Sequence, residues 1–287
     1  MSNFSDYIGG GGSASLINEV VLMNDSDPVV TLDDGRVYLK GGAFETNLAT
    51  YPLAKSSMQQ AGVSFSVSAQ EANPRGLTWD GTNYWVVGTS NDTAYKYTSA
   101  GVYTGTSFSV VAQTATPYGI EWDGTFFWVM SNSGVVYKYN SAGVYQSAWT
   151  ANAEVGSSGR DIVWDGTSFW VLTYTGSIYK YNSAGVYQSY LYISAQSTGS
   201  SGITWDGTYF WVADSTLKLV FKYDASFVYQ DESFDISSEE PSSSALAWTG
   251  THVAMVGTNK DEVHEYRLAN GVESVPASGG QNYVRVA

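Results

Sequence analysis

The residues of this chain that could do chemistry include three that stand at one fixed distance before a tryptophan. Arg75, Tyr118 and Arg160 each lie four residues before a tryptophan, and Ser201 and Ser244 occupy the same place before the next two. Guanidinium groups bind carboxylates and sugar hydroxyls, and this set therefore predicts a ligand site. Solvated rim residues would give the same pattern, and that alternative stays open.

Two carboxylates that do not repeat, Glu121 and Asp161, fall close to the same tryptophans. Glycoside hydrolysis needs a pair of converging carboxylates, so they are the candidates for such chemistry and for ligand binding. A lone carboxylate is more often a surface residue. The two histidines, His252 and His264, show no Ser-His-Asp context. We therefore expect no catalytic residue and no enzymatic activity.

Metal and cofactor sites are not expected. The chain has no cysteine, which excludes thiolate catalysis and Cys-zinc sites. The acidic stretch "NDSDP" at 24–28 lacks the glycine and terminal glutamate of a calcium loop. The run "GGGG" at 9–12 precedes no helix that could bind phosphate and is typical of a flexible linker.

The tetrapeptide "WDGT" organises most of the chain. It occurs four times and once more as "WTGT", and its tryptophans recur every 41 to 43 residues, at Trp79, Trp122, Trp164, Trp205 and Trp248. A period of this length is typical of a propeller blade or a helical array. Within each unit, short runs alternate between apolar and polar residues, which indicates four antiparallel strands.

These units predict an all-β fold, a β-propeller of four-stranded blades. Five blades are expected, with residues 63–67 supplying the outer strand of the fifth and so closing the ring. The alternative is a sixth, split blade made from "RVYLKGGAFETNLATYPLA" and the C-terminal "GGQNYVRVA".

The repeated tryptophans and aspartates are predicted to be structural. Each unit but the last has a second tryptophan six residues after the first, and we expect the two rings to lie side by side between blades, although a sugar-binding cage is the alternative. Trp164→Ala should then cost roughly 3–5 kcal/mol. Asp-Gly predicts a two-residue hairpin with φ > 0 at both positions. The second tryptophans and the aspartates are Trp85, Trp128, Trp170, Trp211, Asp80, Asp123, Asp165 and Asp206.

The variable segments of the repeats predict where a ligand would bind. The Asp-Gly turns and the turns between the third and fourth strands are nearly constant. The other two sets of loops vary and, in a propeller, emerge together on the opposite face. The site around Arg75, Tyr118 and Arg160 is expected at the centre of that variable face.

Three parts are expected along the chain: an attachment segment with a Gly-rich start at 1–62, the propeller at 63–275, and a C-terminal tail strand at 276–287. The net charge of −14 opposes binding to nucleic acid or to an anionic membrane. No signal peptide and no membrane span is expected.

The repeat core "GITWDGTYFWVADS...VFKYD" resembles the NHL-type propeller repeat from about Gly76 to Leu268, although NHL propellers commonly have six blades. Five-bladed lectins of the tachylectin type are similar in architecture only. The flanks "TLDDGRVYLKGGAFETNLATYP" and "GGQNYVRVA" resemble the ends of bacteriophage tail-associated structural proteins.

The resemblance of the flanks implies a non-enzymatic virion component, tail-associated or surface-decorating, released by host lysis. It implies attachment to other virion proteins through the N-terminal segment, a homo-oligomer in the particle, and host recognition with cell-surface glycan as the expected ligand. The alternatives are a free, lectin-like carbohydrate-binding propeller and a polysaccharide-cleaving enzyme.

Overall fold

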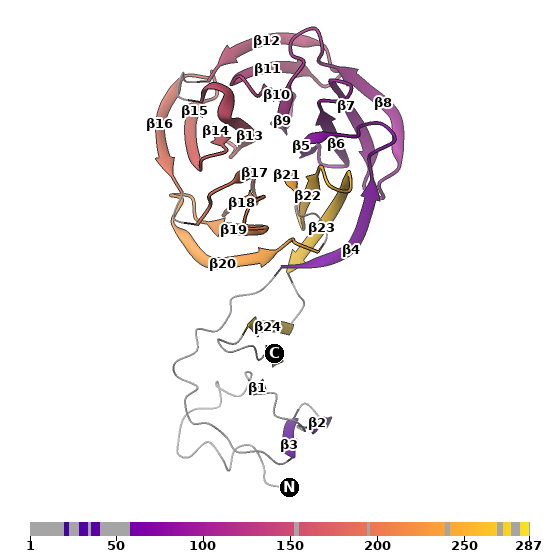
Figure 1. Ribbon diagram of the computed structural model, residues 1–287, viewed down its shortest axis with the longest axis vertical. Helices are drawn as coiled ribbons and strands as arrows, with labels where there is room; N and C mark the ends of the chain where they lie inside the picture. The colour runs from indigo at the N-terminus through magenta and orange to yellow at the C-terminus, as the bar shows by residue number, and fades with distance from the viewer. Residues whose placement is uncertain are drawn as a thin grey trace. The chain divides into compact units, whose positions relative to one another are not determined.

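The computed structural model describes residues 58–268, apart from 152–154, 194–195 and 239–241, together with five short strands outside that range. Residues 58–267 form one compact unit, and the flanking strands belong to a second. The first unit is a ring of five four-stranded antiparallel sheets (Figure 1). The predicted five-bladed β-propeller is therefore confirmed, and the six-bladed alternative is wrong.

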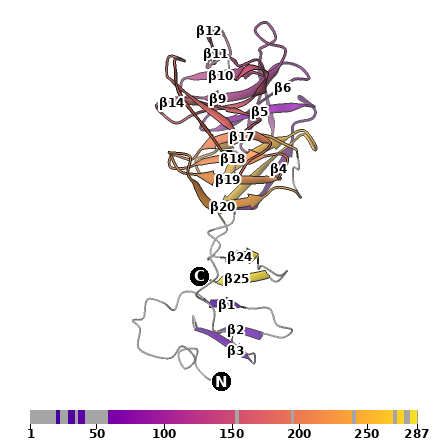
Figure 2. The same cartoon turned by 60° about the vertical axis from the view of Figure 1, so that its left-hand side comes forward.

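The first four blades each run from an inner strand to an outer one in chain order, as Figures 1 and 2 show. The strands of the first three blades are β5 (Pro74–Trp79), β6 (Asn83–Gly88), β7 (Thr93–Thr98) and β8 (Tyr103–Ser109); β9 (Pro117–Trp122), β10 (Phe126–Ser131), β11 (Val135–Asn140) and β12 (Tyr145–Thr150); and β13 (Gly159–Trp164), β14 (Ser168–Thr173), β15 (Ser177–Asn182) and β16 (Tyr187–Tyr192).

The fourth blade follows the same order, and the fifth takes its outermost strand from the start of the propeller. Their strands are β17 (Ser200–Trp205), β18 (Phe210–Asp214), β19 (Leu219–Tyr223) and β20 (Tyr229–Asp235); and β21 (Ser243–Trp248), β22 (Val253–Gly257) and β23 (Glu262–Leu268) with β4 (Met58–Ser66) outermost. One 3-10 turn, η3 (Gly156–Ser158), precedes β13.

Closure of the ring depends on β4, which pairs with β23 and completes blade five. Residues 63–66 of the expected closing segment at 63–67 thus lie in this strand, which begins at Met58. The contact continues one residue further, where the Val67 amide donates to the Asp261 carbonyl at 2.8 Å. Because the first strand of the propeller pairs with the last blade, blade five is complete and the ring has no open edge there.

The core lies between the blades, where five separate apolar clusters fill the five gaps. The second tryptophan of a repeat points to the next blade: Trp85 lies 4.7 Å from Phe127, measured between ring centroids. The first tryptophan points the other way, since Trp79 pairs with Tyr84 whereas Trp85 pairs with Thr78. The two rings of one repeat therefore lie on opposite faces of the blade, and the expectation that they lie side by side is wrong.

The Asp-Gly turns are three-residue connections in the first three blades, and only their glycines have positive φ, as at Gly81 with φ +93°. Asp80 keeps an ordinary backbone and uses its carboxylate instead: Oδ1 accepts the amides of Thr82 and Asn83 at 3.0 and 2.8 Å. The two-residue turn with two positive φ values is therefore a wrong prediction, because the side chain closes the turn.

The second unit is described by its strands alone. β1 (Val20–Leu22), β25 (Asn282–Val286) and β24 (Val272–Pro276) form one small sheet, and β2 (Val29–Asp33) pairs with β3 (Arg36–Lys40). The propeller thus spans 58–267, compared with the expected 63–275, and the expected tail at 276–287 contains β25. Most of the attachment segment at 1–62 lies outside the described residues.

Candidate functional site

The inner strands of the blades converge at the axis and place three of the predicted ligand residues together. Arg75 is the second residue of β5, Tyr118 of β9 and Arg160 of β13. The guanidinium carbons of Arg75 and Arg160 lie 5.1 and 5.2 Å from the centre of the Tyr118 ring. Both separations are those of cation–π contacts.

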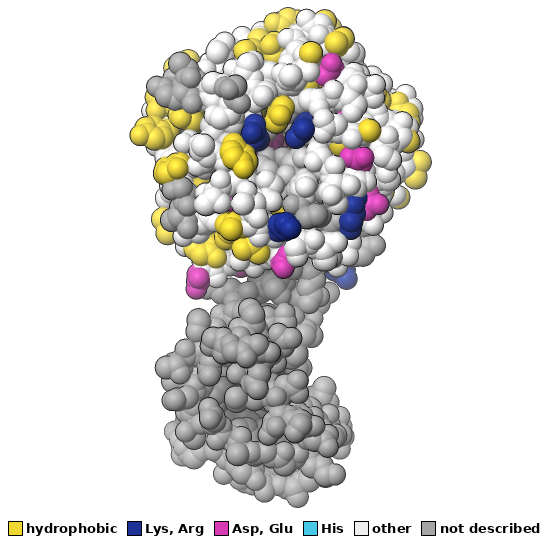
Figure 3. All heavy atoms as spheres, viewed as in Figure 1, with side chains coloured by type: hydrophobic (Ala, Val, Ile, Leu, Met, Phe, Trp, Pro, Cys, Tyr) yellow, Lys and Arg dark blue, Asp and Glu magenta, His cyan; other side chains and the backbone are white. Residues whose placement is uncertain are grey.

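A further aromatic ring, that of Tyr174, joins this group from the loop between β14 and β15. Its centre lies 5.0 Å from the guanidinium of Arg160, and the side chain is 40% exposed. We call these four residues, Arg75, Tyr118, Arg160 and Tyr174, the axial mouth. Figure 3 shows basic side chains beside hydrophobic ones near the middle of this face.

The Arg160 side chain is held in place by two acceptors. Its Nη1 donates to the Gly159 carbonyl at 3.1 Å and to the Asn132 side chain at 3.5 Å. Partial burial lowers the pKa of the guanidinium, and the charge of Arg75 acts in the same direction. Buried Nε of Arg75 has no hydrogen-bond partner. Neither arginine makes a salt bridge to any residue that the structure describes.

Ser201 and Ser244 are the second residues of the inner strands of the last two blades, the place that was predicted for them, but both side chains are buried. The Ser201 hydroxyl hydrogen-bonds with that of Ser243 at 2.9 Å and donates to the Ala213 carbonyl at 3.4 Å. Ser201 therefore links blades four and five and makes no recorded contact with the arginines.

Asp161 lies on the axis next to the mouth and is 1% exposed. Its Oδ1 accepts its neighbour's amide at Ile162, at 2.9 Å, and its Oδ2 accepts the Ile203 amide of blade four at 3.0 Å. On the blade-two side, a Cβ added to Gly119 would fall 2.8 Å from Oδ1. Glycine thus leaves the space that the carboxylate fills. Burial raises the pKa of Asp161 well above its usual range.

Glu121 lies nearer the other end of its strand, beside the Asp-Gly turn, and so is separate from the mouth. Its Oε1 accepts the Trp164 amide of blade three at 3.0 Å, and its Oε2 accepts the Thr78 hydroxyl of blade one at 3.2 Å. Burial raises the pKa of Glu121 to about 8, although these hydrogen bonds oppose the shift.

The two axial carboxylates thus satisfy backbone amides of inner strands that have no partner strand on the axis side. A raised pKa is also what a general acid needs. In this structure, however, the oxygens of both groups already accept hydrogen bonds from the protein. The two carboxyl groups therefore have a structural role as they stand. A catalytic role would require a substrate to displace the donors that now bind them.

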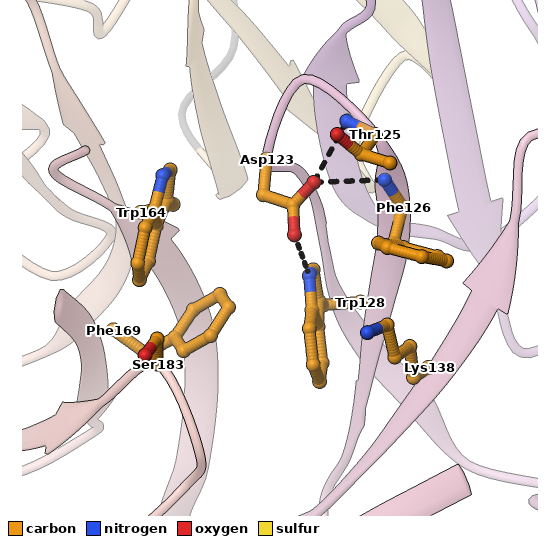
Figure 4. Close-up of a pocket in the computed structure, with 8 residues that line it drawn as sticks. All are labelled: Asp123, Thr125, Phe126, Trp128, Lys138, Trp164, Phe169 and Ser183. Atoms are coloured by element: carbon orange, nitrogen blue, oxygen red, sulfur yellow. Dashed lines mark hydrogen bonds between the residues drawn. The ribbon is translucent and has the colours of Figure 1, made fainter. Parts of the chain in front are cut away.

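A cavity of about 250 Å³ opens on the opposite face, between blades two and three (Figure 4). Blade two contributes Asp123, Trp128 and Lys138, and blade three contributes Trp164 and Phe169. The Asp123 carboxylate accepts the Trp128 indole N–H at 2.7 Å, and Lys138 Nζ lies 5.0 Å from the Trp128 ring centre. The cavity is therefore lined by the repeat itself.

This Asp-Trp-Lys arrangement recurs in four blades, with the indole nitrogen 2.7–2.8 Å from the carboxylate each time. Lys96, Lys138, Lys180 and Lys222 lie 4.7–5.3 Å from the tryptophan of their own blade. Thr249, Ala254 and Glu265 take these places in blade five. The Tyr84 hydroxyl of blade one donates to Glu265 there, a contact peculiar to the ring closure.

The sequence identified the inner-strand residues of the mouth but not Tyr174 or Asn132. Both lie in loops between the second and third strands, within the segments recognised as variable. The signal for Tyr174 was an aromatic residue in an otherwise polar loop, "TYTGS". Its contact with Arg160 depends on the arrangement of neighbouring strands, which the repeat alone does not specify.

Within the described ranges, no group of three or more His, Cys, Asp or Glu side chains is placed to hold a metal ion. The same residues include no helix long and apolar enough to cross a bilayer.

Comparison with known proteins supports the fold alone. No family model and no curated protein matches the chain. Glutaminyl cyclase of Myxococcus xanthus is similar with a TM-score of 0.57 and 12% identity, over 74% of this chain and 97% of that one. A nidogen/laminin complex has a TM-score of 0.49 at 12% identity, over 64% and 72%. The similarity to the cyclase agrees with the β-propeller fold, and identities this low carry no activity over to this chain.

Proposed function

We propose that this chain is a non-enzymatic binding propeller that holds host-surface glycan at the axial mouth. The observation that supports it is the mouth itself: two guanidinium groups and two tyrosine rings, at the centre of the face that carries the variable loops. Sugars bind to aromatic faces and to fixed polar groups, and both are present here.

We further propose that the propeller is a component of a bacteriophage virion, tail-associated or surface-decorating, with residues 1–62 as its attachment to the particle. This part of the proposal rests on the resemblance of the two flanks to phage tail-associated proteins. Virion proteins and further copies of the chain would be its partners. Antibody against the chain should label the host particle in negative-stain images, and unlabelled particles would contradict the assignment.

Glycan binding is tested by a glycan array with the full chain and two tyrosine variants. Tyr118→Ala removes the ring that both arginines contact, and binding should fall at least about tenfold. Tyr190→Ala, which removes a ring that is 63% exposed on the outer strand of blade three, is the matched control and should bind as wild type does. Equal binding by both variants would place any glycan site elsewhere.

A second candidate, a lectin with several equivalent sites, is favoured by the cavity between blades two and three. Its aspartate, tryptophans and lysine have equivalents between blades one and two and between blades three and four. Calorimetry separates the two candidates, since the axial mouth gives one ligand per chain and the inter-blade cavities would give more.

A further inference from the structure

The axial mouth brings two positive charges together, and no described carboxylate forms a salt bridge with either. Arg75 and Arg160 belong to different blades, yet both lie against the ring of Tyr118. Two neighbouring guanidinium groups repel each other, and a protein usually offsets that repulsion with a carboxylate. Among the described residues, the salt bridges involve other side chains only.

The nearest carboxylate along the chain does not supply the missing charge. Asp161 directly follows Arg160, but its two oxygens accept the amides of Ile162 and Ile203. Burial also raises its pKa, which disfavours the charged form. Asp161 therefore does not neutralise the positive charge of the mouth.

The donors of the mouth are also incompletely used. Nε of Arg75 is buried and makes no hydrogen bond, and a buried donor without a partner is costly. Arg160, by contrast, is fixed by Gly159 and Asn132, so its guanidinium is held in one position. Two guanidinium groups that lie against one ring and make no salt bridge among the described residues are an arrangement that a two-oxygen anion can pair with.

Two further features bear on the kind of anion that the mouth could hold. The net charge of −14 disfavours the approach of anions to the chain as a whole, so an anion must gain its binding energy from local contacts. The exposed ring of Tyr174 offers an apolar platform next to Arg160, which suits the face of a sugar ring. An anion attached to a sugar uses both features.

We propose that the axial mouth recognises an acidic sugar, with its carboxylate or phosphate bound between Arg75 and Arg160 and its ring on Tyr174. This inference rests on the proposed glycan-binding function and narrows the class of glycan. The two sources of the anion, a sugar acid and a sugar phosphate, share the same recognition chemistry and are separated by the experiment.

The test measures binding of the full chain to four small probes by saturation-transfer NMR and calorimetry. The probes are glucuronic acid, glucose 1-phosphate, methyl glucuronate and glucose. We expect the anions to bind at least about tenfold more tightly than the two neutral probes, because charge-assisted hydrogen bonds are lost with the charge. The tighter anion identifies the source. Binding of the anions should weaken as sodium chloride is raised.

Three variants locate the effect. Arg75→Gln and Arg160→Gln should each reduce anion binding to near the level of methyl glucuronate, whereas Lys218→Gln, on the loop between β18 and β19 of the same face, should not. Circular dichroism checks that each variant is folded. The wild-type comparison of acid with ester needs no variant at all.

The outcomes distinguish this inference from the proposed function. If the neutral probes bind wild type as tightly as the anions, the acidic-sugar inference is overturned and glycan binding stands. If no probe binds and the glycan array is also blank, both are overturned. If the anions bind to Arg75→Gln and Arg160→Gln as tightly as to wild type, the anion site lies outside the mouth and the inference is overturned.

Discussion

The Asp123 carboxylate shows how one side chain can hold both a turn and a ring. One oxygen accepts the amides of Thr125 and Phe126, both at 2.8 Å, and the other accepts the Trp128 indole N–H. Blade five loses the aspartate and the tryptophan together, as Thr249 and Ala254. The joint loss is expected if each residue is useful mainly because of the other.

A double-mutant cycle on this pair tests that interdependence. Asp123→Ala and Trp128→Phe should show a coupling of about 1.5–3 kcal/mol in the free energy of unfolding, since a hydrogen bond to a charged group contributes this much. Denaturant unfolding of the two single variants and the double variant gives the value. Additive losses would mean that the two residues act independently.

The Glu121 carboxyl predicts an unusual dependence of stability on pH. Its pKa in the folded protein is about 8, above the ordinary value of 4.5, so the folded state binds this proton more tightly than the unfolded state does. Its contribution is complete below the ordinary value and is lost as the pH rises through about 8. Glu121→Gln should therefore unfold at a higher temperature than wild type near pH 9.

The comparison between wild type and Glu121→Gln cancels the groups that titrate alike in both proteins. Asp161 also has a raised pKa, and the Glu121 charge contributes to it, so part of its titration changes in the variant. At acid pH the order should reverse or vanish, because protonated Glu121 is then satisfied in the wild type. A constant difference in melting temperature from pH 5 to pH 9 would contradict the assigned pKa.

Between elements, the tryptophans divide into two classes that the sequence does not separate. Those of the second strands, such as Trp128, are only 2–6% exposed, whereas those of the inner strands, such as Trp164, are half-buried. The repeat predicted that both are structural, and it could not assign depth because both recur with the same period.

Substitution of the two classes should differ in cost. Trp128→Ala should destabilise the propeller by about 3–5 kcal/mol. Trp164→Ala should cost less than that, and so less than the sequence alone predicts, because Trp164 is only half-buried. Thermal and denaturant unfolding of the two variants, whose side chains border the same cavity, provides the comparison. A larger loss for Trp164→Ala would contradict the assigned depths.

The strand order, the blade count and the closing strand could all be predicted from the chain, because each depends on a local pattern that is repeated. The mouth could be predicted only in part. Arg75, Tyr118 and Arg160 share one place in the repeat and therefore one end of the inner strands. Packing between blades determines that Glu121 lies apart from these residues and that Tyr174 lies beside Arg160. The periodicity of the sequence does not encode that packing.

At the scale of the whole molecule, β4 decides whether the ring is closed. Removal of residues 1–57 should leave the propeller folded, because this unit begins at Met58. Removal of residues 1–66 takes away the outer strand of blade five and should lower the melting temperature by several degrees or abolish cooperative unfolding. Calorimetry of both truncations tests this, and equal melting temperatures would mean that β4 contributes nothing.

The antiparallel pairing of β4 with β23 has a consequence for the way the propeller is connected. The chain enters the ring at Met58 and leaves it at Leu268, and these two points lie at the same end of two neighbouring strands. A unit whose entry and exit points adjoin can be inserted in a surface loop of another protein without separating the two ends of that loop. The propeller is thus suited to insertion into other proteins, and residues 58–268 are the segment to transfer.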